Sequence, residues 1–209
     1  MDGGLEQLYG QLGNTTKKKE KISLLKQYEN DEKVKNLLKR CYDSKEMFNV
    51  CKADVTSVGT CSILDEYENI MKLFTVLSTR EVTGNAAKQL VSTQAERLTK
   101  ESQNLFFALL NKDLKVGVNV KLLNEAYGES FINLFEIQLA NKYSDFVSKK
   151  KSKSISHFYA SRKLNGIRCY VDRNGTIVSR QGLEIVGFSH ISEEIKNLCQ
   201  MHNIDFVDG

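Results

Sequence analysis

A lysine between two arginines is the feature of this sequence best suited to covalent chemistry. Lys163 follows Arg162 and precedes Asn165-Gly166, a turn signal, after which Arg168 begins a β-type run. A lysine amine attacks only when neutral, and the flanking arginines could lower its pKa. Attack on the α-phosphate of a nucleoside triphosphate would give a lysyl phosphoramidate and release pyrophosphate. Arginine forks and a divalent metal would hold the phosphates. The alternative is a solvent-facing lysine before a hairpin turn.

Two further segments downstream carry charged groups at strand or hairpin ends. Ser179-Arg180-Gln181-Gly182 follows a short β-type run and contains its own turn signal. The run ending in Phe206-Val207-Asp208-Gly209 reads as a strand that delivers a carboxylate. Together with Lys163, these segments form an ordered series of a lysine, an arginine and an aspartate.

With these three segments, the sequence resembles the ATP-dependent DNA ligases, most closely those of T-even-like bacteriophages. In that family the first nucleotidyltransferase motif reads Lys-x-Asp-Gly-x-Arg, a Ser-Arg-x-Gly motif follows, and a third motif reads Asp-Gly-Glu. The resemblance implies that Lys163 is the adenylylated nucleophile and that nicked duplex DNA is the partner. It also implies ATP and Mg²⁺ as cofactors. The residues expected to bind ATP or AMP are Arg162, Lys163, Arg168, Arg180 and Asp208.

One position inside the first motif departs from the family pattern. Asn165 stands where the family usually has aspartate. Asparagine keeps the turn geometry and a hydrogen-bonding oxygen, but it lacks the negative charge that could orient a metal or the lysine.

The upstream part of the chain carries two segments that look like parts of the ligases' helical DNA-binding domain. Residues 77–87 contain Thr-Gly-Asn-Ala-Ala, and residues 111–117 contain Asp-Leu-x-x-Gly. Both read as helix ends with small residues, where free backbone N–H groups could meet a phosphate. The alternative for each is a helix cap with tight packing. The residues expected to contact DNA are Thr83, Gly84, Asn85, Lys112, Lys115 and Gly117, with Lys149, Lys150 and Lys151.

The periodicity of apolar residues predicts an α+β chain with two folded parts. Residues 1–147 show helical spacing and predict an all-helical DNA-binding domain of about seven to nine helices. Residues 148–154 form a Ser/Lys linker without an apolar side chain. Residues 155–209 predict an incomplete antiparallel-β nucleotidyltransferase, or adenylation, domain, truncated at the third motif. The expected strands are residues 157–161, 167–172, 176–180, 183–186 and 204–207, with a helix over residues 190–201.

Local signals give sharper expectations within these parts. Asp31 is predicted to cap a helix, and Ser62 with Asp65 resembles a capping box that opens another. Gly84 and Asn85 are expected to interrupt a helical pattern. Asn174-Gly175 predicts a tight hairpin. The inner face of the last helix is expected to carry Ile191, Ile195 and Leu198.

Composition excludes several classes of protein. The chain has 209 residues, of which 41% are apolar, so disorder is not expected. No apolar stretch approaches the length of a membrane span, and no signal peptide begins the chain, so a cytoplasmic protein is expected. The five cysteines are an odd number without Cys-x-x-Cys pairs, and they predict free thiols.

Two functions from different classes remain open at the level of sequence. In the first, the chain is the N-terminal fragment of a ligase that seals 3′-hydroxyl/5′-phosphate nicks through lysyl-AMP only together with its missing C-terminal part, which is either encoded separately or lost. In the second, it is a non-catalytic module that binds the backbone of duplex DNA. The family's later glutamates, motif lysines and OB-fold domain have no counterpart in this sequence, so the chain alone is not expected to ligate.

Overall fold

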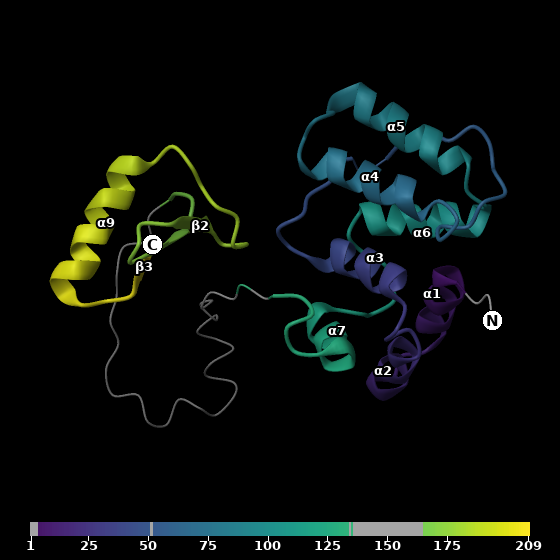
Figure 1. The fold of residues 1–209 in the computed structure, drawn as a ribbon, viewed down its shortest axis with the longest axis horizontal. Helices are drawn as coiled ribbons and strands as arrows, with labels where there is room; N and C mark the ends of the chain where they lie inside the picture. The colour runs from purple at the N-terminus through teal and green to yellow at the C-terminus, as the bar shows by residue number, and fades with distance from the viewer. Residues whose placement is uncertain (1–3, 51, 134, 136–164) are drawn as a thin grey trace. The chain divides into compact units, whose positions relative to one another are not determined.

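The computed structural model describes residues 4–50, 52–133, 135 and 165–209. These residues divide into two compact units, Met1–Leu134 and Phe135–Gly209. The first unit is helical and the second contains a small sheet with one helix, so the α+β class predicted from the sequence is confirmed (Figure 1). The expected linker and its boundaries at residues 148–154 lie outside the described residues, and they stay a prediction.

The helical unit contains seven described helices, consistent with the expected number. They are α1 (Leu5–Asn14), α2 (Lys18–Lys26), α3 (Glu32–Tyr42), α4 (Tyr67–Ser78), α5 (Gly84–Glu96), α6 (Lys100–Leu110) and α7 (Val120–Tyr127). Helix α6 packs against α1, α3 and α5, and α2 packs against α7 (Figure 1). The core therefore forms around α6.

Aromatic and leucine side chains fill this core, as the helical periodicity predicts. Phe74 of α4 stacks between Phe48 and Phe106, with ring centroids 4.5 and 6.1 Å away. Phe74 and Phe106 are fully buried. Leu90 of α5 does not contribute to this core, because it is 44% exposed.

Polar side chains cap three of these helices. The Asp31 carboxylate accepts from the Val34 N–H at 3.1 Å, which confirms the predicted cap of α3. Thr99 and Asn119 cap α6 and α7 in the same way. Capping satisfies backbone donors that have no partner within the helix.

Two predicted helix boundaries are wrong by a few residues. Ser62 and Asp65 exchange the hydrogen bonds of a capping box, but the turn they stabilise precedes α4, which begins only at Tyr67. Gly84 and Asn85 do not interrupt a helix; they are the first residues of α5. Gly84 has φ +62°, a conformation that glycine adopts without strain, and it lets the chain enter the helix sharply.

The second unit contains three antiparallel strands in the order β2-β1-β3 and one helix. They are β1 (Cys169–Asp172), β2 (Ile177–Ser179), β3 (Phe206–Asp208) and α9 (Ser189–His202). The turn at Asn174-Gly175 is confirmed, because Gly175 has φ +85° and its N–H donates to the Asp172 carbonyl at 2.9 Å. Helix α9 packs against β1 and β3 (Figure 1).

Several details of this unit differ from the sequence expectation. Residues 183–186 do not form a strand; one bridge joins Val178 to Glu184, and Val186 is 80% exposed. Cys199, and not Leu198, is the buried residue of α9. Ile191 and Ile195 of the predicted inner face are half-buried, and the buried stripe continues at a spacing of four to Cys199, so only the last residue of the predicted face is wrong. The expected strand over residues 157–161 lies outside the described residues.

The four described cysteines, Cys41, Cys61, Cys169 and Cys199, are free thiols, as expected. No helix in the described part of the chain is long and apolar enough to cross a membrane.

Candidate nucleotide and DNA sites

The candidate nucleotide site lies at one end of the β1–β2 hairpin. The strand register pairs Cys169 with Ser179, so Arg168 and Arg180 are the next residues at that end. The neighbouring strand β3 brings Asp208 opposite Tyr170. Three of the five residues predicted to bind ATP or AMP are thus gathered on one small sheet. Arg162 and Lys163 lie outside the described residues, so their roles stay predictions.

Arg168 and Asp208 form a two-pronged ion pair. The guanidinium Nε donates to Oδ1 at 2.7 Å, and Nη2 donates to Oδ2 at 2.5 Å. The hydrogen bonds from Arg168 hold the pKa of the Asp208 carboxyl below its ordinary value. Arg168 Nη1 makes no hydrogen bond to the described residues. The carboxylate therefore fixes the guanidinium plane and leaves one amino group for a further acceptor.

Arg180 is held in position through its backbone. The Ser179 hydroxyl accepts from the Leu183 N–H at 3.2 Å, and the Gly182 N–H donates to the Ser179 carbonyl at 2.9 Å. Gly182 has φ +79°, and a Cβ there would lie 2.8 Å from the Phe135 side chain. The Ser-Arg-x-Gly segment is thus a tight turn that exposes the Arg180 guanidinium.

The described residues fit the phosphates of a nucleotide better than they fit a metal. Arg168 and Arg180 offer guanidinium donors on an exposed hairpin end, which suits phosphate oxygens. Within residues 4–50, 52–133, 135 and 165–209, no three His, Cys, Asp or Glu side chains come together as metal ligands would. We therefore assign no metal ligand.

In the helical unit, one predicted DNA segment surrounds the start of α5. The Thr83 hydroxyl makes no capping hydrogen bond, and the first turn of α5 contains no acidic residue. Asn85 is exposed, and a Cβ on Gly84 would meet nothing within 4 Å. The first N–H groups of α5 are therefore accessible to an acceptor from outside.

Arg80 is an additional candidate beside this segment. It ends α4 in a left-handed conformation, φ +60°, and the Glu81 N–H donates to the Val76 carbonyl at 3.1 Å, as in a Schellman motif. Arg80, Thr83 and Gly84 line one small hollow of about 60 Å³. The sequence places Arg80 within residues 77–87, but only the helix end shows that it faces the same hollow.

The second predicted DNA segment, residues 111–117, contains two lysines with different surroundings, Lys112 and Lys115. Lys112 also ends a helix with a left-handed conformation, but its ammonium donates to the Arg40 and Asp43 carbonyls at 3.1 and 2.5 Å. It lies 5.6 Å from the centre of the Phe48 ring. Burial lowers the pKa of Lys112. The Lys112 side chain thus caps the end of α3, while Lys115 is exposed.

Gly117 serves packing in this structure. It has φ +65°, and a Cβ there would lie 2.6 Å from the ammonium of Lys21. Lys21 is buried and donates to the Val116 carbonyl at 2.5 Å. The packing alternative for Gly117 therefore has direct support. Lys149, Lys150 and Lys151 lie outside the described residues.

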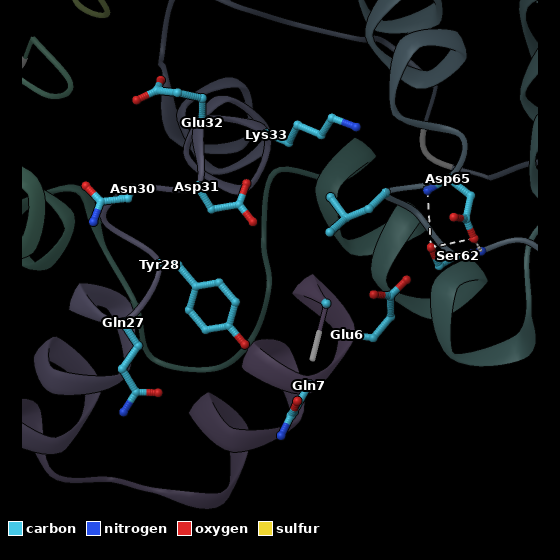
Figure 2. Close-up of a pocket in the computed structure, with 12 residues that line it drawn as sticks. Glu6, Gln7, Gln27, Tyr28, Asn30, Asp31, Glu32, Lys33, Ser62 and Asp65 are labelled. Carbon is cyan, nitrogen blue, oxygen red and sulfur yellow. Dashed lines mark hydrogen bonds between the residues drawn. The ribbon is translucent and has the colours of Figure 1, made fainter. Parts of the chain in front are cut away.

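A wide hollow of the helical unit is lined mainly by acidic and neutral side chains. It has a volume of about 1090 Å³ and lies between the α1 start, the α2–α3 turn and the Ser62–Asp65 turn (Figure 2). Among the described residues that line it, Lys33 is the one with a positively charged side chain. The excess of carboxylates disfavours the binding of phosphates in this hollow. The lining carboxylates are Glu6, Asp31, Glu32 and Asp65.

Comparison with known proteins agrees with the resemblance found in the sequence. No protein-family model matches the chain. The chain is similar to the DNA ligases of Enterobacteria phages T4 and T6, with 23% identity over 185 residues in each. The match covers 85% of this chain and 37% of each ligase, so the chain spans well under half of these curated relatives.

Solved structures support the same assignment. Pmar-Lig_PreS3 superposes with a TM-score of 0.77 and 26% identity, covering 98% of this chain and 49% of its own. A second structure, Pmar-Lig_Pre, has a TM-score of 0.75 with the same coverage. The fold is thus of the α+β class and is similar to that of solved structures named as ligases. In particular, this chain is similar to the N-terminal portion of the phage ligases.

Proposed function

We propose that this chain is the DNA-binding and nucleotide-accepting portion of an ATP-dependent DNA ligase. The observation that carries the proposal is the hairpin end where Arg168, Arg180 and Asp208 are assembled. Of these residues, Arg168 follows Lys163 by five positions in the chain. The similarity to phage ligases over 85% of the chain supports it. In this proposal, the helical unit holds nicked duplex DNA and the sheet unit holds ATP.

The proposed chemistry begins with the neutral amine of Lys163. The amine attacks the α-phosphorus of ATP, a phosphorus–nitrogen bond forms, and the bond to the leaving pyrophosphate breaks. Arg168 would bind a phosphate oxygen through Nη1 while Asp208 holds its other edge. Arg180 would bind a second phosphate oxygen. When bound, Mg²⁺ would neutralise charge on the phosphates.

Sealing of a nick would follow in two further transfers. The AMP passes from Lys163 to the 5′-phosphate of the nick, and the 3′-hydroxyl then displaces AMP to form the phosphodiester. We propose that these transfers need the polypeptide that corresponds to the unmatched part of the relatives, because Arg180 and Asp208 are exposed and Arg168 is half-buried, whereas stabilisation of the transferred phosphate needs groups in a site closed to water.

A nick-sealing assay tests the proposal. The full chain is mixed with a polypeptide that comprises the part of Pmar-Lig_PreS3 beyond its match to this chain, with ATP, Mg²⁺ and a labelled nicked duplex. Sealing that disappears in Lys163→Ala and in Arg180→Ala supports the ligase portion. If Lys163→Ala seals at the same rate as the unchanged pair, the proposed nucleophile is wrong.

A second function is favoured by the helical unit itself. This unit has its own continuous core, and the first turn of α5 presents uncapped N–H groups beside Arg80. Such a unit could bind the DNA backbone without chemistry. Duplex binding in which log K falls linearly with log salt, but without any AMP transfer by the mixed chains, would favour this non-catalytic module.

A further inference from the structure

The side chain of Phe135 packs against the turn that carries Arg180. A Cβ on Gly182 would lie 2.8 Å from Cβ and 2.9 Å from Cγ of Phe135, so no side chain larger than that of glycine fits at this position. Phe135 precedes Lys163 in the chain, but it belongs to the same compact unit as the hairpin. The glycine that ends the Ser-Arg-x-Gly segment thus makes room for the Phe135 side chain.

The ring of Phe135 also contacts the central strand of the sheet. Phe135 and Tyr170 of β1 meet edge to face, with ring centroids 5.7 Å apart and ring planes at 85°. Tyr170 stacks in turn on Phe206 of β3, with centroids 4.8 Å apart. Aromatic pairs in these geometries attract each other beyond the effect of the area they bury. Phe135 is thus held by the turn through one contact and by β1 through another.

The strand register places Tyr170 on the face of the sheet that carries the ion pair. Tyr170 lies opposite Asp208, and residues directly opposite each other in an antiparallel pair project to the same face. Asp208 holds Arg168 through two hydrogen bonds, so Arg168 reaches this face as well. Phe135 therefore joins the strands that position Arg168 and Asp208 to the turn that positions Arg180.

The orientation of the turn depends on packing of this kind. Its hydrogen bonds are local, from the Gly182 N–H to the Ser179 carbonyl and from the Leu183 N–H to the Ser179 hydroxyl. They fix the inner shape of the turn, but they do not fix the direction in which it leaves β2, a strand of three residues. Groups that bind a ligand are held in direction by the packing of neighbouring side chains, and Phe135 supplies such packing from outside the hairpin.

We infer that Phe135 is a positioning residue of the proposed nucleotide site, which it serves by holding the Arg180 turn in a fixed orientation to the Arg168–Asp208 pair. Two guanidinium groups bind neighbouring phosphate oxygens only if their separation matches that of the oxygens. Phe135 sets this separation through the turn and acts through Arg180. The inference rests on the proposed function, because it assigns Phe135 a role in binding the phosphates of ATP.

Amide hydrogen exchange tests the inference without any nucleotide. In the full chain labelled with ¹⁵N, Phe135→Ala should speed the exchange of the Gly182 and Leu183 amides about tenfold, because the turn loses its restraint. The Gly175 amide closes the turn between β1 and β2, and the Arg173 amide bonds to the chain before β3, so both should change little. Unchanged rates at Gly182 and Leu183, or an equal acceleration at all four amides, would overturn the inference.

Nucleotide affinity tests whether the orientation of the turn matters for binding. The probe is α,β-methylene-ATP with Mg²⁺, which cannot transfer AMP, titrated into the full chain by calorimetry. Phe135→Ala should weaken binding about fivefold, but it should cause no further loss in a chain that already carries Arg180→Ala. Phe135→Tyr, which keeps the ring, should retain most of the affinity. Losses that add in the double variant would show a general structural effect and overturn the inference.

Phe131→Ala is the matched control. Phe131 is also half-buried, and its ring meets Tyr127 edge to face with centroids 4.9 Å apart, but it belongs to the helical unit. This variant should change neither the turn amides nor the affinity, and effects equal to those of Phe135→Ala would overturn the inference. A full chain that binds no α,β-methylene-ATP before any substitution would contradict the proposed function, whereas the exchange rates still decide whether Phe135 orients the turn.

Discussion

At the scale of single residues, Glu66 is a buried charge of the helical unit with several hydrogen-bond partners. Its side chain is 6% exposed, and it accepts hydrogen bonds from Asn69 at 2.8 Å, Gln94 at 3.1 Å and Arg97 Nε at 3.0 Å. These contacts tie the start of α4 to the end of α5. A buried carboxylate of this kind is tolerated only while its partners remain.

Glu66→Gln should lower the free energy of unfolding by about 1 to 2 kcal/mol, since Arg97 loses its charged partner. Glu68→Gln, two residues away and exposed, is the matched control and should change it by under about 0.5 kcal/mol. Chemical denaturation at pH 7 measures both. Equal effects of the two variants would show that the Glu66 contacts do not stabilise the fold.

The contribution of Glu66 to the stability of the fold is expected to depend on pH. Hydrogen bonds, first from Asn69 and then from Gln94 and Arg97, lower the pKa of Glu66 from its ordinary value of 4.5. A carboxyl whose pKa is lower in the folded state than in the unfolded state stabilises the fold fully at pH values above its unfolded-state pKa. This stabilisation is lost as the pH falls through the folded-state pKa. The difference in the free energy of unfolding between the unchanged chain and Glu66→Gln should therefore shrink below about pH 4.5. Chemical denaturation at a series of pH values measures it.

Lys112 has a structural role, whereas Lys115 is a candidate DNA contact. Both have a left-handed backbone, with φ +57° and +54°, but only Lys112 reaches the carbonyls at the end of α3. Lys112→Ala should lower the free energy of unfolding by about 1 to 2 kcal/mol, because a helix end loses its cation. Lys115→Ala should leave stability unchanged and weaken duplex binding. The reverse assignment in paired denaturation and binding titrations would contradict this account.

At the scale of elements, the loop before α7 is joined to α2 by a buried lysine. Gly117→Ala should be destabilising for two reasons: its φ of +65° disfavours a side chain, and the new methyl displaces Lys21 from the Val116 carbonyl. Gly84→Ala shares the first cost, at φ +62°, but meets no neighbour. We expect a loss of about 1 kcal/mol for Gly84→Ala and more for Gly117→Ala, measured by thermal unfolding. Equal losses would show that Lys21 moves freely.

Element types were predictable, but several boundaries were not. The Asp31 cap and the Asn174-Gly175 turn depend on local backbone chemistry, which sequence displays directly. The start of α4 at Tyr67 depends on tertiary contacts, because Glu6 of α1 accepts from the Ile63 N–H at 2.8 Å and holds the preceding turn. Neither this contact nor the buried Lys21 is visible as a local pattern.

The residues of the candidate nucleotide site could also be selected from local sequence, but the contacts between them could not. Arg168, Arg180 and Asp208 could be selected from motif order alone. The ion pair between Arg168 and Asp208 follows from the register of β1 with β3, a pairing of residues about forty positions apart. The predicted DNA contact of the loop that contains Lys112 stays a prediction, and only the packing of α3 against α6 shows that the Lys112 side chain reaches the end of α3.

At the scale of the whole molecule, the two units differ in how much core each possesses. The helical unit has a continuous core centred on α6, whereas Val171, Ile177 and Cys199 are the buried apolar residues among those described in the sheet unit. A chain comprising residues 1–134 should therefore unfold cooperatively and keep the main thermal transition of the full chain. Scanning calorimetry of both chains measures this. A molten fragment would show that the helical unit needs the sheet unit.

The central claim of the account is that Lys163 accepts AMP. The full chain, mixed with the polypeptide comprising the part of Pmar-Lig_PreS3 beyond its match, is incubated with ATP and Mg²⁺ and analysed by mass spectrometry of the peptide that contains Lys163. The account predicts one AMP adduct on Lys163, absent in Lys163→Arg, which keeps the charge but lacks the amine nucleophile. A folded mixture with no adduct, or with the same adduct in Lys163→Arg, would contradict it.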